Sequence, residues 1–346
     1  MEAPYRALAV CGPTASGKSA LGIKLAQSLS GEVLNVDSVQ VYRHLTIGCA
    51  KVTELERQGV PHHLLDLFEP DQPANVGQFR ECALVALKDV VSREKLPIVV
   101  GGSGMYLTAL LHGLAELPES SEEVRWAVRG LSPDEQYAEL LSADPETAQR
   151  LSRNDTQRVS RAVEVIRMTG RKLSSILAEH RFSARDVVAL IIVLCKPRDE
   201  LYRAIDQRVV RMLEAGLVAE TRDLVERFRG AAALKTLGYA QAREFMEGRL
   251  PEAALATEIA LHTRRFAKRQ MTYWRNEPLK RGWRVYPGDG DHAEEVGGFE
   301  SSPQRAHKRM KGFRALRYSE SELQAAVKER LSKPLDTSEV WMVWLR

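Results

Sequence analysis

The sequence has no hydrophobic run long enough to cross a membrane. Its longest run, residues 187–195, has nine apolar residues, whereas a membrane-spanning helix needs about 18 or more. Only four of the 346 residues are cysteine and none forms a CxxC pair, so neither a disulfide framework nor a zinc module is expected. The first residues, which include Glu2, lack the form of a signal peptide. We therefore expect a cytoplasmic protein with no membrane association.

The sequence also lacks a strong net charge, since 50 Lys and Arg residues against 46 Asp and Glu residues leave +4. Its basic residues are nevertheless concentrated in residues 264–284 and 304–317, with an acidic stretch at residues 289–300 between them. Such stretches in a balanced chain favour an anionic partner bound at one place, and the alternative is a solvated helix face. A hydrophobic fraction of 44% over 346 residues is typical of a globular protein of about two domains.

Short apolar runs alternate with helical patterns, which is typical of a parallel α/β sheet. We expect strands at residues 7–11, 32–36, 97–100 and 187–195. Ligands bind beyond the carboxyl ends of such strands. The segments at residues 12–19, 37 and 101–106 are therefore predicted to meet in one site.

The region after the third expected strand loses strand character and becomes polar and helical, so we interpret it as a helical insertion in the α/β core. The predicted domains are a core, an insertion, and a linker with a C-terminal extension of unknown role: residues 1–117 with 184–288, residues 118–183, and residues 289–346. Within the extension, the pattern predicts a short helix at residues 319–331 and a short strand at residues 340–345.

A glycine-rich loop follows the first expected strand and fits the pattern G-x-x-x-x-G-K-[ST]. Its residues are Gly12, Pro13, Thr14, Ala15, Ser16, Gly17, Lys18 and Ser19. Backbone N–H groups of such a loop cradle a di- or triphosphate, while the lysine adds charge and the Ser19 hydroxyl can ligate Mg²⁺. The sequence therefore predicts a P-loop-type parallel sheet, flanked by helices, that binds a polyphosphate. The loop does not say which polyphosphate.

Further motifs follow in order from about residue 6 to residue 287. They include Asp37-Ser38-Val39-Gln40-Val41-Tyr42, Ile47-Gly48-Cys49-Ala50-Lys51, Gly101-Gly102-Ser103-Gly104-Met105-Tyr106, Asn154-Asp155-Thr156-Gln157-Arg158 and Thr263-Arg264-Arg265-Phe266-Ala267-Lys268-Arg269-Gln270. With the phosphate loop, they make the chain resemble the tRNA dimethylallyltransferases, the isopentenyl transferase family. The sequence departs from the family pattern at Cys49 and Ser103, where Thr is usual, and at Ala204, which is often Arg.

The resemblance implies an enzyme that transfers a dimethylallyl group from dimethylallyl diphosphate to N6 of the adenosine adjacent to the anticodon in tRNA, releasing diphosphate. Residues 12–19 would hold the diphosphate of this donor rather than ATP. The resemblance also implies Mg²⁺ as cofactor and the tRNA anticodon loop as partner. We further expect a monomer without an obligate protein partner.

The family's functional positions can be placed on this sequence. Asp37 matches the general base, Arg208 a phosphate-binding arginine needed for catalysis, and Lys18 the catalytic lysine of the loop. The positions that match tRNA-contacting residues are Asp37, Ser38, Val39, Gln40, Ser103, Arg125, Gln157, Arg158, Val159, Ser160 and Arg161. From residue type alone, a magnesium ligand or a helix cap remains an alternative for Asp37, and a surface ion pair for Arg208.

Three other functions are compatible with part of the sequence. A nucleotide or small-molecule kinase would use the loop for ATP, but it leaves Asp37 and Gln40 and the arginine-rich insertion unexplained. An enzyme that prenylates free adenine nucleotides would not need such an insertion. A non-catalytic RNA-binding protein would not need Lys18, Ser19 and Asp37 to be intact.

Overall fold

The computed structural model describes residues 4–180, 186–281, 284–285, 293–295, 314–335 and 337–345. The chain divides into two compact units. Unit 1 comprises residues 1–111 and 186–346, and unit 2 comprises residues 112–185. Among the described residues, none of the helices combines the length and the hydropathy that a membrane span requires.

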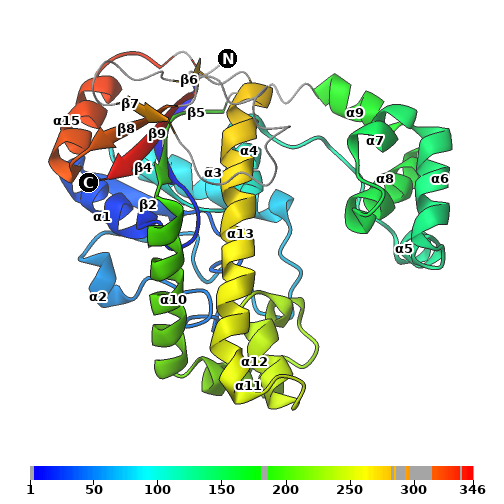
Figure 1. Ribbon diagram of the computed structural model, residues 1–346. Coiled ribbons are helices and arrows are strands. Elements are labelled where there is room, and N and C mark those ends of the chain that lie inside the picture. The colour runs from blue at the N-terminus through cyan, green and yellow to red at the C-terminus, as the bar shows by residue number, and fades with distance from the viewer. Residues whose placement is uncertain are drawn as a thin grey trace. The chain divides into compact units, whose positions relative to one another are not determined.

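Unit 1 is built on one sheet (Figure 1). Its described strands are β1 (Tyr5–Cys11), β2 (Gly31–Asn35), β3 (His62–His63), β4 (Leu96–Gly101), β5 (Val187–Cys195), β6 (Arg284–Val285), β7 (Ala293–Glu295), β8 (Arg314–Tyr318) and β9 (Glu339–Leu345). The order is β3-β2-β4-β1-β5-β9-β8-β7, with β6 paired to β9. Only the pair of β7 and β8 is antiparallel among these described strands. The predicted parallel α/β fold is therefore confirmed.

Helices cover both faces of this sheet (Figure 1). The described helices of unit 1 are α1 (Lys18–Ser28), α2 (Glu54–Arg57), α3 (Val76–Ser92), α4 (Gly104–His112), α10 (Arg198–Glu214), α11 (Leu217–Arg227), the 3-10 helix η1 (Ala232–Lys235), α12 (Tyr239–Met246), α13 (Glu252–Arg281) and α15 (Glu320–Leu331). α1 and α15 pack on one face, and α3, α4, α10 and α13 belong to the hydrophobic layer of the other.

Alternate residues of the central strands enter these two hydrophobic layers. On β1, Ala7 and Ala9 lie in the layer of α3 and α10, whereas Leu8 and Val10 lie in the layer of α1 and α15. All nine residues of β5 are buried. A parallel strand covered on both faces has no polar side, so its sequence is a continuous apolar run.

The end of the chain belongs to unit 1, which corrects the expectation of an extension separate from the core. β9 pairs with β5 in the interior of the sheet. The expected helix and strand are both present as α15 and β9, and the Ser319 hydroxyl caps α15 by accepting from the Glu322 N–H group. Of the acidic stretch at residues 289–300 only β7 lies among the described residues. Of the basic stretch at residues 304–317 only part of β8 does.

Unit 2 is helical and has its own core. Its helices are α5 (Glu122–Arg129), α6 (Pro133–Ala143), α7 (Pro145–Arg150), α8 (Thr156–Thr169) and α9 (Leu173–His180). It spans residues 112–185, whereas the insertion was expected at residues 118–183. Asp144 is fully buried between α6 and α7. Its carboxylate accepts hydrogen bonds from the backbone N–H and hydroxyl groups of both Thr147 and Ser174.

Candidate functional site

The predicted phosphate loop, residues 12–19, lies between the carboxyl end of β1 and the first turn of α1. Gly12 has φ 146°, and a Cβ atom there would lie 2.8 Å from the carbonyl oxygen of Leu194. Gly17 precedes α1 with φ 96° in the left-handed region. These conformations favour glycine. They leave the N–H groups at the start of α1 available to an anion.

Two side chains of the loop's end line a pocket of about 340 Å³, namely Lys18 and Ser19. Burial lowers the pKa of Lys18 from 10.5 to about 8; the charge of Arg208 lowers it further, and that of Asp37 raises it. Two neighbouring cations repel each other in a poorly solvated site, and a bound anion would relieve that repulsion. The pocket is therefore suited to a phosphate or diphosphate group.

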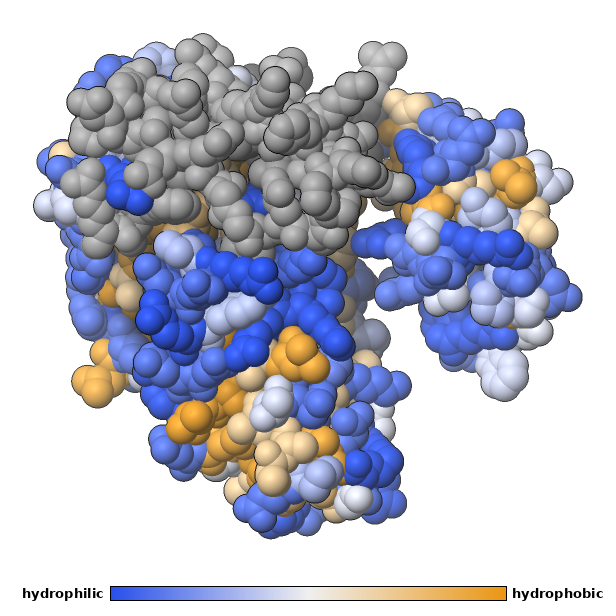
Figure 2. Space-filling model, viewed as in Figure 1, coloured by the Kyte–Doolittle hydropathy of each residue, from blue (hydrophilic) through white to orange (hydrophobic). Residues whose placement is uncertain are grey.

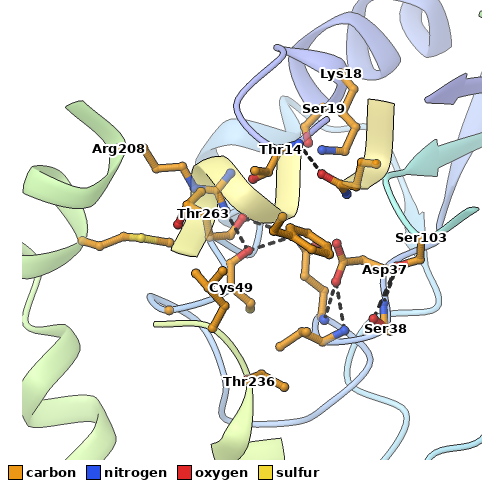
Figure 3. Close-up of a pocket in the computed structure, with 18 of the residues that line it drawn as sticks. Thr14, Lys18, Ser19, Asp37, Ser38, Cys49, Ser103, Arg208, Thr236 and Thr263 are labelled. Carbon is orange, nitrogen blue, oxygen red and sulfur yellow. Dashed lines mark hydrogen bonds between the residues drawn. The ribbon is translucent and has the colours of Figure 1, made fainter. Parts of the chain in front are cut away.

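Asp37 follows β2 and faces the same pocket (Figure 3). Its Oδ1 atom accepts hydrogen bonds from the N–H groups of Val39 at 2.9 Å and Gln40 at 3.3 Å. The carboxylate thus caps a turn rather than a helix. Among the described residues, no partner is bonded to the Oδ2 atom, which leaves that oxygen able to accept a proton.

Ser38 and Ser103 lie beside Asp37 in this view (Figure 3). The Ser38 N–H group donates to the Ser103 hydroxyl at 3.1 Å, so the ends of β2 and β4 are joined at the pocket wall. The side-chain amide of Gln40 donates to the carbonyl oxygens of Cys49 at 3.2 Å and Ala50 at 3.4 Å. The predicted residues 37–40 and Ser103 therefore line one continuous wall.

Arg208 reaches the pocket from α10, and its Nη2 group donates to the Cys49 carbonyl oxygen at 3.3 Å (Figure 3). Burial lowers the pKa of its guanidinium group, an effect that the negative charge of Asp37 partly offsets. No carboxylate forms an ion pair with Arg208 among the described residues. The alternative of a surface ion pair is therefore wrong.

Cys49, at a position where the family usually has Thr, belongs to the same wall. Its thiol donates to the Leu45 carbonyl oxygen at 3.0 Å. Burial raises the pKa of this thiol to about 12, so it remains protonated and unreactive. The contact with Arg208 uses the backbone carbonyl, which the departure from threonine leaves in place.

The rest of the pocket is largely apolar and comes from the second half of unit 1. Its apolar lining includes Val209, Met212, Leu237 and Phe266. Met212 is 8% exposed and belongs both to the hydrophobic core and to the pocket wall. Figure 2 shows hydrophobic side chains among hydrophilic ones over α10 to α13.

The long helix α13 contributes pocket-lining residues to which the sequence assigned no individual role. Thr263, Phe266, Arg269 and Gln270 all line the pocket. The buried Gln270 amide accepts from the Thr14 N–H group at 2.8 Å and donates to the Gly102 carbonyl oxygen at 3.0 Å. The run at residues 263–270 carried a signal, because it matched a family motif. Spacing alone did not reveal which side chains face inward.

The remaining predicted tRNA-contacting residues lie in unit 2. Arg125 and Arg161 meet at Ser120, because Arg125 donates to its carbonyl oxygen at 3.2 Å and Arg161 to its hydroxyl. Gln157 and Arg158 are exposed on α8. Ser160 donates to the Gln136 side chain at 2.6 Å, and that bond turns it toward α6.

Val159 corrects the prediction for this segment. Its side chain is 1% exposed and packs in the core of unit 2 with Val128, Leu140 and Val163. The helical period turns it about 200° away from the exposed Gln157 side chain and about 100° away from Arg158. Val159 is therefore a core residue, and its side chain is not available to a tRNA.

Comparison with known proteins gives a consistent result. The family model described as IPP transferase matches residues 40–277. The tRNA dimethylallyltransferase 1 of Citrifermentans bemidjiense is 42% identical over 289 residues, which cover 83% of this chain and 94% of that protein. The tRNA dimethylallyltransferase of Anoxybacillus flavithermus is 38% identical and covers 79% of this chain and 88% of its own length.

Solved structures of tRNA-modifying transferases are also similar to this chain. A full-length tRNA isopentenylpyrophosphate transferase from Bacillus halodurans has a TM-score of 0.58 and 32% identity, over 79% of this chain and 88% of its own. A eukaryotic dimethylallyltransferase acting on tRNA has a TM-score of 0.71 and 27% identity, over 80% of this chain and 71% of its own. The matched part of the chain contains most of the pocket wall described above, and on this evidence the chain belongs to the IPP transferase family.

Proposed function

We propose that this protein transfers a dimethylallyl group from dimethylallyl diphosphate to N6 of the adenosine adjacent to the anticodon in tRNA, and releases diphosphate. One observation carries the proposal beyond family membership. A single pocket holds two desolvated cations, Lys18 and Arg208, together with Arg269, the carboxylate of Asp37 and an apolar wall. The cations match the diphosphate, the apolar wall matches the prenyl group, and the carboxylate matches the amine of the base.

The cationic end of the pocket suits the leaving group. As the allylic C–O bond breaks, negative charge grows on the diphosphate, and the loop amides, Lys18 and Arg208 are placed to stabilise it. The Ser19 hydroxyl would hold Mg²⁺, which adds positive charge to the same oxygens. No cluster of three or more ligating side chains occurs among the described residues. That fits an ion bound mainly by diphosphate oxygens and water.

The apolar wall suits the prenyl group. Val209, Met212 and Leu237 offer only carbon and sulfur atoms to a ligand at this wall. A pocket closed to water by such side chains also protects a cationic allylic centre from hydrolysis. We expect the group to lie against α10 with its C1 atom toward Asp37.

The nucleophile is the exocyclic amine of adenine, whose lone pair is delocalised into the ring. A carboxylate within hydrogen-bond reach can take the N–H proton as the C–N bond forms. Asp37 supplies that carboxylate through its Oδ2 atom, since Oδ1 already caps the turn at Val39 and Gln40. Asp37 can take this proton only while its carboxylate is ionised.

The target base is stacked in the anticodon loop and must leave the stack to enter the pocket, which costs a few kcal/mol. Contacts with Ser38, Ser103 and exposed side chains of unit 2 would offset this cost. Gln157 and Arg158 are exposed and available for such contacts. Proteins typically recognise RNA in this way: they bind unstacked loop bases in a pocket and contact the RNA backbone with basic residues.

The kinase alternative has no support. The relatives and structures described above are named for tRNA modification, not for phosphate transfer. We propose further that the protein works as a monomer in the cytoplasm.

A direct assay tests the proposal. The protein is incubated with Mg²⁺, dimethylallyl diphosphate and unmodified tRNA, and the digested nucleosides are analysed by mass spectrometry. A prenylated adenosine, absent when the tRNA carries guanosine beside the anticodon, is the expected result. ATP hydrolysis or phosphate transfer without that product would contradict the proposal.

A further inference from the structure

A carboxylate outside the pocket holds the loop that forms one of its walls. Glu220, in the first turn of α11, accepts hydrogen bonds from the N–H group of Ile47 at 2.9 Å and from that of Gly48 at 3.3 Å. It also accepts from the Tyr239 hydroxyl at 2.6 Å. The tyrosine oxygen in turn accepts from the Gly48 N–H group at 3.1 Å. Glu220 and Tyr239 therefore fix residues 47 and 48 through their backbone.

The fit between this pair and the loop is close. Tyr239 is fully buried, and a Cβ atom on Gly48 would lie 2.5 Å from its ring. Burial and, to a lesser extent, neighbouring negative charge raise the pKa of Tyr239 well above its usual range, so the hydroxyl keeps its proton and donates a hydrogen bond to Glu220. Neither Glu220 nor Tyr239 lines the pocket.

The next residue of the loop connects this anchor to the reacting groups. The Cys49 carbonyl oxygen accepts from Arg208 at 3.3 Å and from Gln40 at 3.2 Å. Among the described residues this is the only hydrogen bond of the Arg208 side chain. The direction of its guanidinium group consequently depends on where the loop places one carbonyl.

We propose that Glu220, together with Tyr239, is a positioning residue for Arg208 in prenyl transfer. The inference rests on the proposed function. The carboxylate fixes the N–H groups of residues 47 and 48, the fixed loop presents the Cys49 carbonyl, and that carbonyl aims a desolvated arginine at the diphosphate. Charge-assisted hydrogen bonds of this kind are stronger than neutral ones, and a small displacement of a group that stabilises the transition state can cost about 100-fold in rate.

Two variants remove the anchor in different ways. Glu220→Gln keeps the size of the side chain but removes the charge, and Tyr239→Phe removes the hydroxyl but keeps the ring. Each should lower kcat by about 10- to 100-fold, with little change in the KM for tRNA. Glu226→Gln is the matched control, because Glu226 lies on the same helix and is exposed. It should leave both constants unchanged.

A double-mutant comparison separates positioning from general structural support. Single-turnover rates are measured for Arg208→Ala, with and without Glu220→Gln, and thermal unfolding is followed for every variant. If Glu220 acts through Arg208, Glu220→Gln should add no further loss of rate when the arginine is absent. Where Glu220→Gln does not fold, Tyr239→Phe carries the same comparison.

Two results would overturn the inference: unchanged kcat in both anchor variants, or a loss of rate that multiplies with that of Arg208→Ala. Failure of the proposed function is a separate outcome, because the wild-type protein would then form no prenylated adenosine in the same assay.

Discussion

The two units use arginine in opposite ways. In unit 2, six arginines are neutralised by acids of the same unit, in the pairs Arg150–Glu146, Arg153–Asp134, Arg158–Asp155, Arg161–Glu164, Arg167–Glu139 and Arg171–Glu179. In the pocket of unit 1, Arg208 has no such partner among the described residues, and Lys18 lies near it.

This difference separates charge that supports the fold from charge that is kept for a ligand. Exposed ion pairs add little stability and little net field, so an arginine-rich sequence in unit 2 does not make a strongly basic surface. Lys18 and Arg208 in the pocket are desolvated, which lowers the pKa of both side chains. Such perturbed groups in a cleft are typical of functional sites.

The largest expected effect comes from the pocket carboxylate. Asp37→Asn keeps an oxygen that can accept from the N–H groups of Val39 and Gln40, so the turn should persist. It cannot take a proton, and the rate of prenyl transfer should fall at least about 100-fold, the scale of lost general-base catalysis. Single-turnover rates and tRNA binding measured side by side check this, and binding should remain nearly intact. Wild-type turnover in Asp37→Asn would remove the role assigned to the carboxylate.

Asp144 is the buried carboxylate of unit 2, and its role is structural. Asp144→Ala should lower the free energy of unfolding by about 2 kcal/mol, because four donors lose a charged acceptor in a buried position. Asp134→Ala, whose carboxylate is exposed, should cost less than about 1 kcal/mol. Urea denaturation of the full chain compares the two, and equal costs would contradict the assignment.

The same carboxylate makes stability depend on pH. Hydrogen bonding outweighs burial and lowers the pKa of Asp144 from 3.8 to about 2. The ionised form therefore stabilises the fold above pH 3.8, and this contribution should be lost as the pH falls toward 2. Asp144→Asn should remove that part of the acid sensitivity.

The activity should depend on pH in the opposite direction, because Lys18 must keep its proton to stay charged. With a pKa of about 8 in the free protein, the lysine is charged below pH 8 and loses its proton above it. The kcat/KM for the prenyl donor should be constant below pH 8 and then fall up to about tenfold per pH unit. Lys18→Arg, which stays charged, should shift this fall to higher pH. An unchanged profile would contradict the role of Lys18.

The smallest effect concerns salt. Binding of tRNA should weaken with rising salt, with a slope of about −0.7 to −0.9 per neutralised phosphate. Arg158→Gln should reduce the magnitude of that slope by about one phosphate, since its side chain is 73% exposed and a tRNA phosphate can replace Asp155 in its surface ion pair. Arg167→Gln is the control, because Arg167 is only 31% exposed and is held by two hydrogen bonds to Glu139, and its slope should stay unchanged. A flat salt response of the wild-type protein would contradict RNA binding by unit 2.

Local patterns predicted much of the fold and part of the site. The loop at residues 12–19 follows a strand that is recognisable from five apolar residues, because burial between two helix layers demands such runs. The strand before the turn at Asp37 has three, Val33, Leu34 and Val36. The helix α15 was predictable from its own period and its Ser319 cap. Roles for Asp37 and Arg208 came from motif resemblance, not from spacing.

Features that depend on distant contacts were missed. The position of β9 beside β5 is set by pairing between residues 190–195 and 339–344, and no local pattern specifies such a partner. The burial of Val159 depends on α5 and α6, and the ion pairs Arg153–Asp134 and Arg167–Glu139 depend on how the helices of unit 2 fold together. The inward direction of Gln270 likewise depends on the packing of α13 against the phosphate loop.

By itself, the sequence determined the class of fold, the phosphate loop and the chemistry that the resemblance implies, since these depend on residue types at short spacing. Only the tertiary structure decided that Arg208 joins Lys18 and Asp37 in one pocket and that the Cys49 carbonyl holds the arginine. It also decided that most arginines of unit 2 are already paired. Burial and proximity set the charge state and direction of a side chain, and both arise only when segments far apart in the chain pack together.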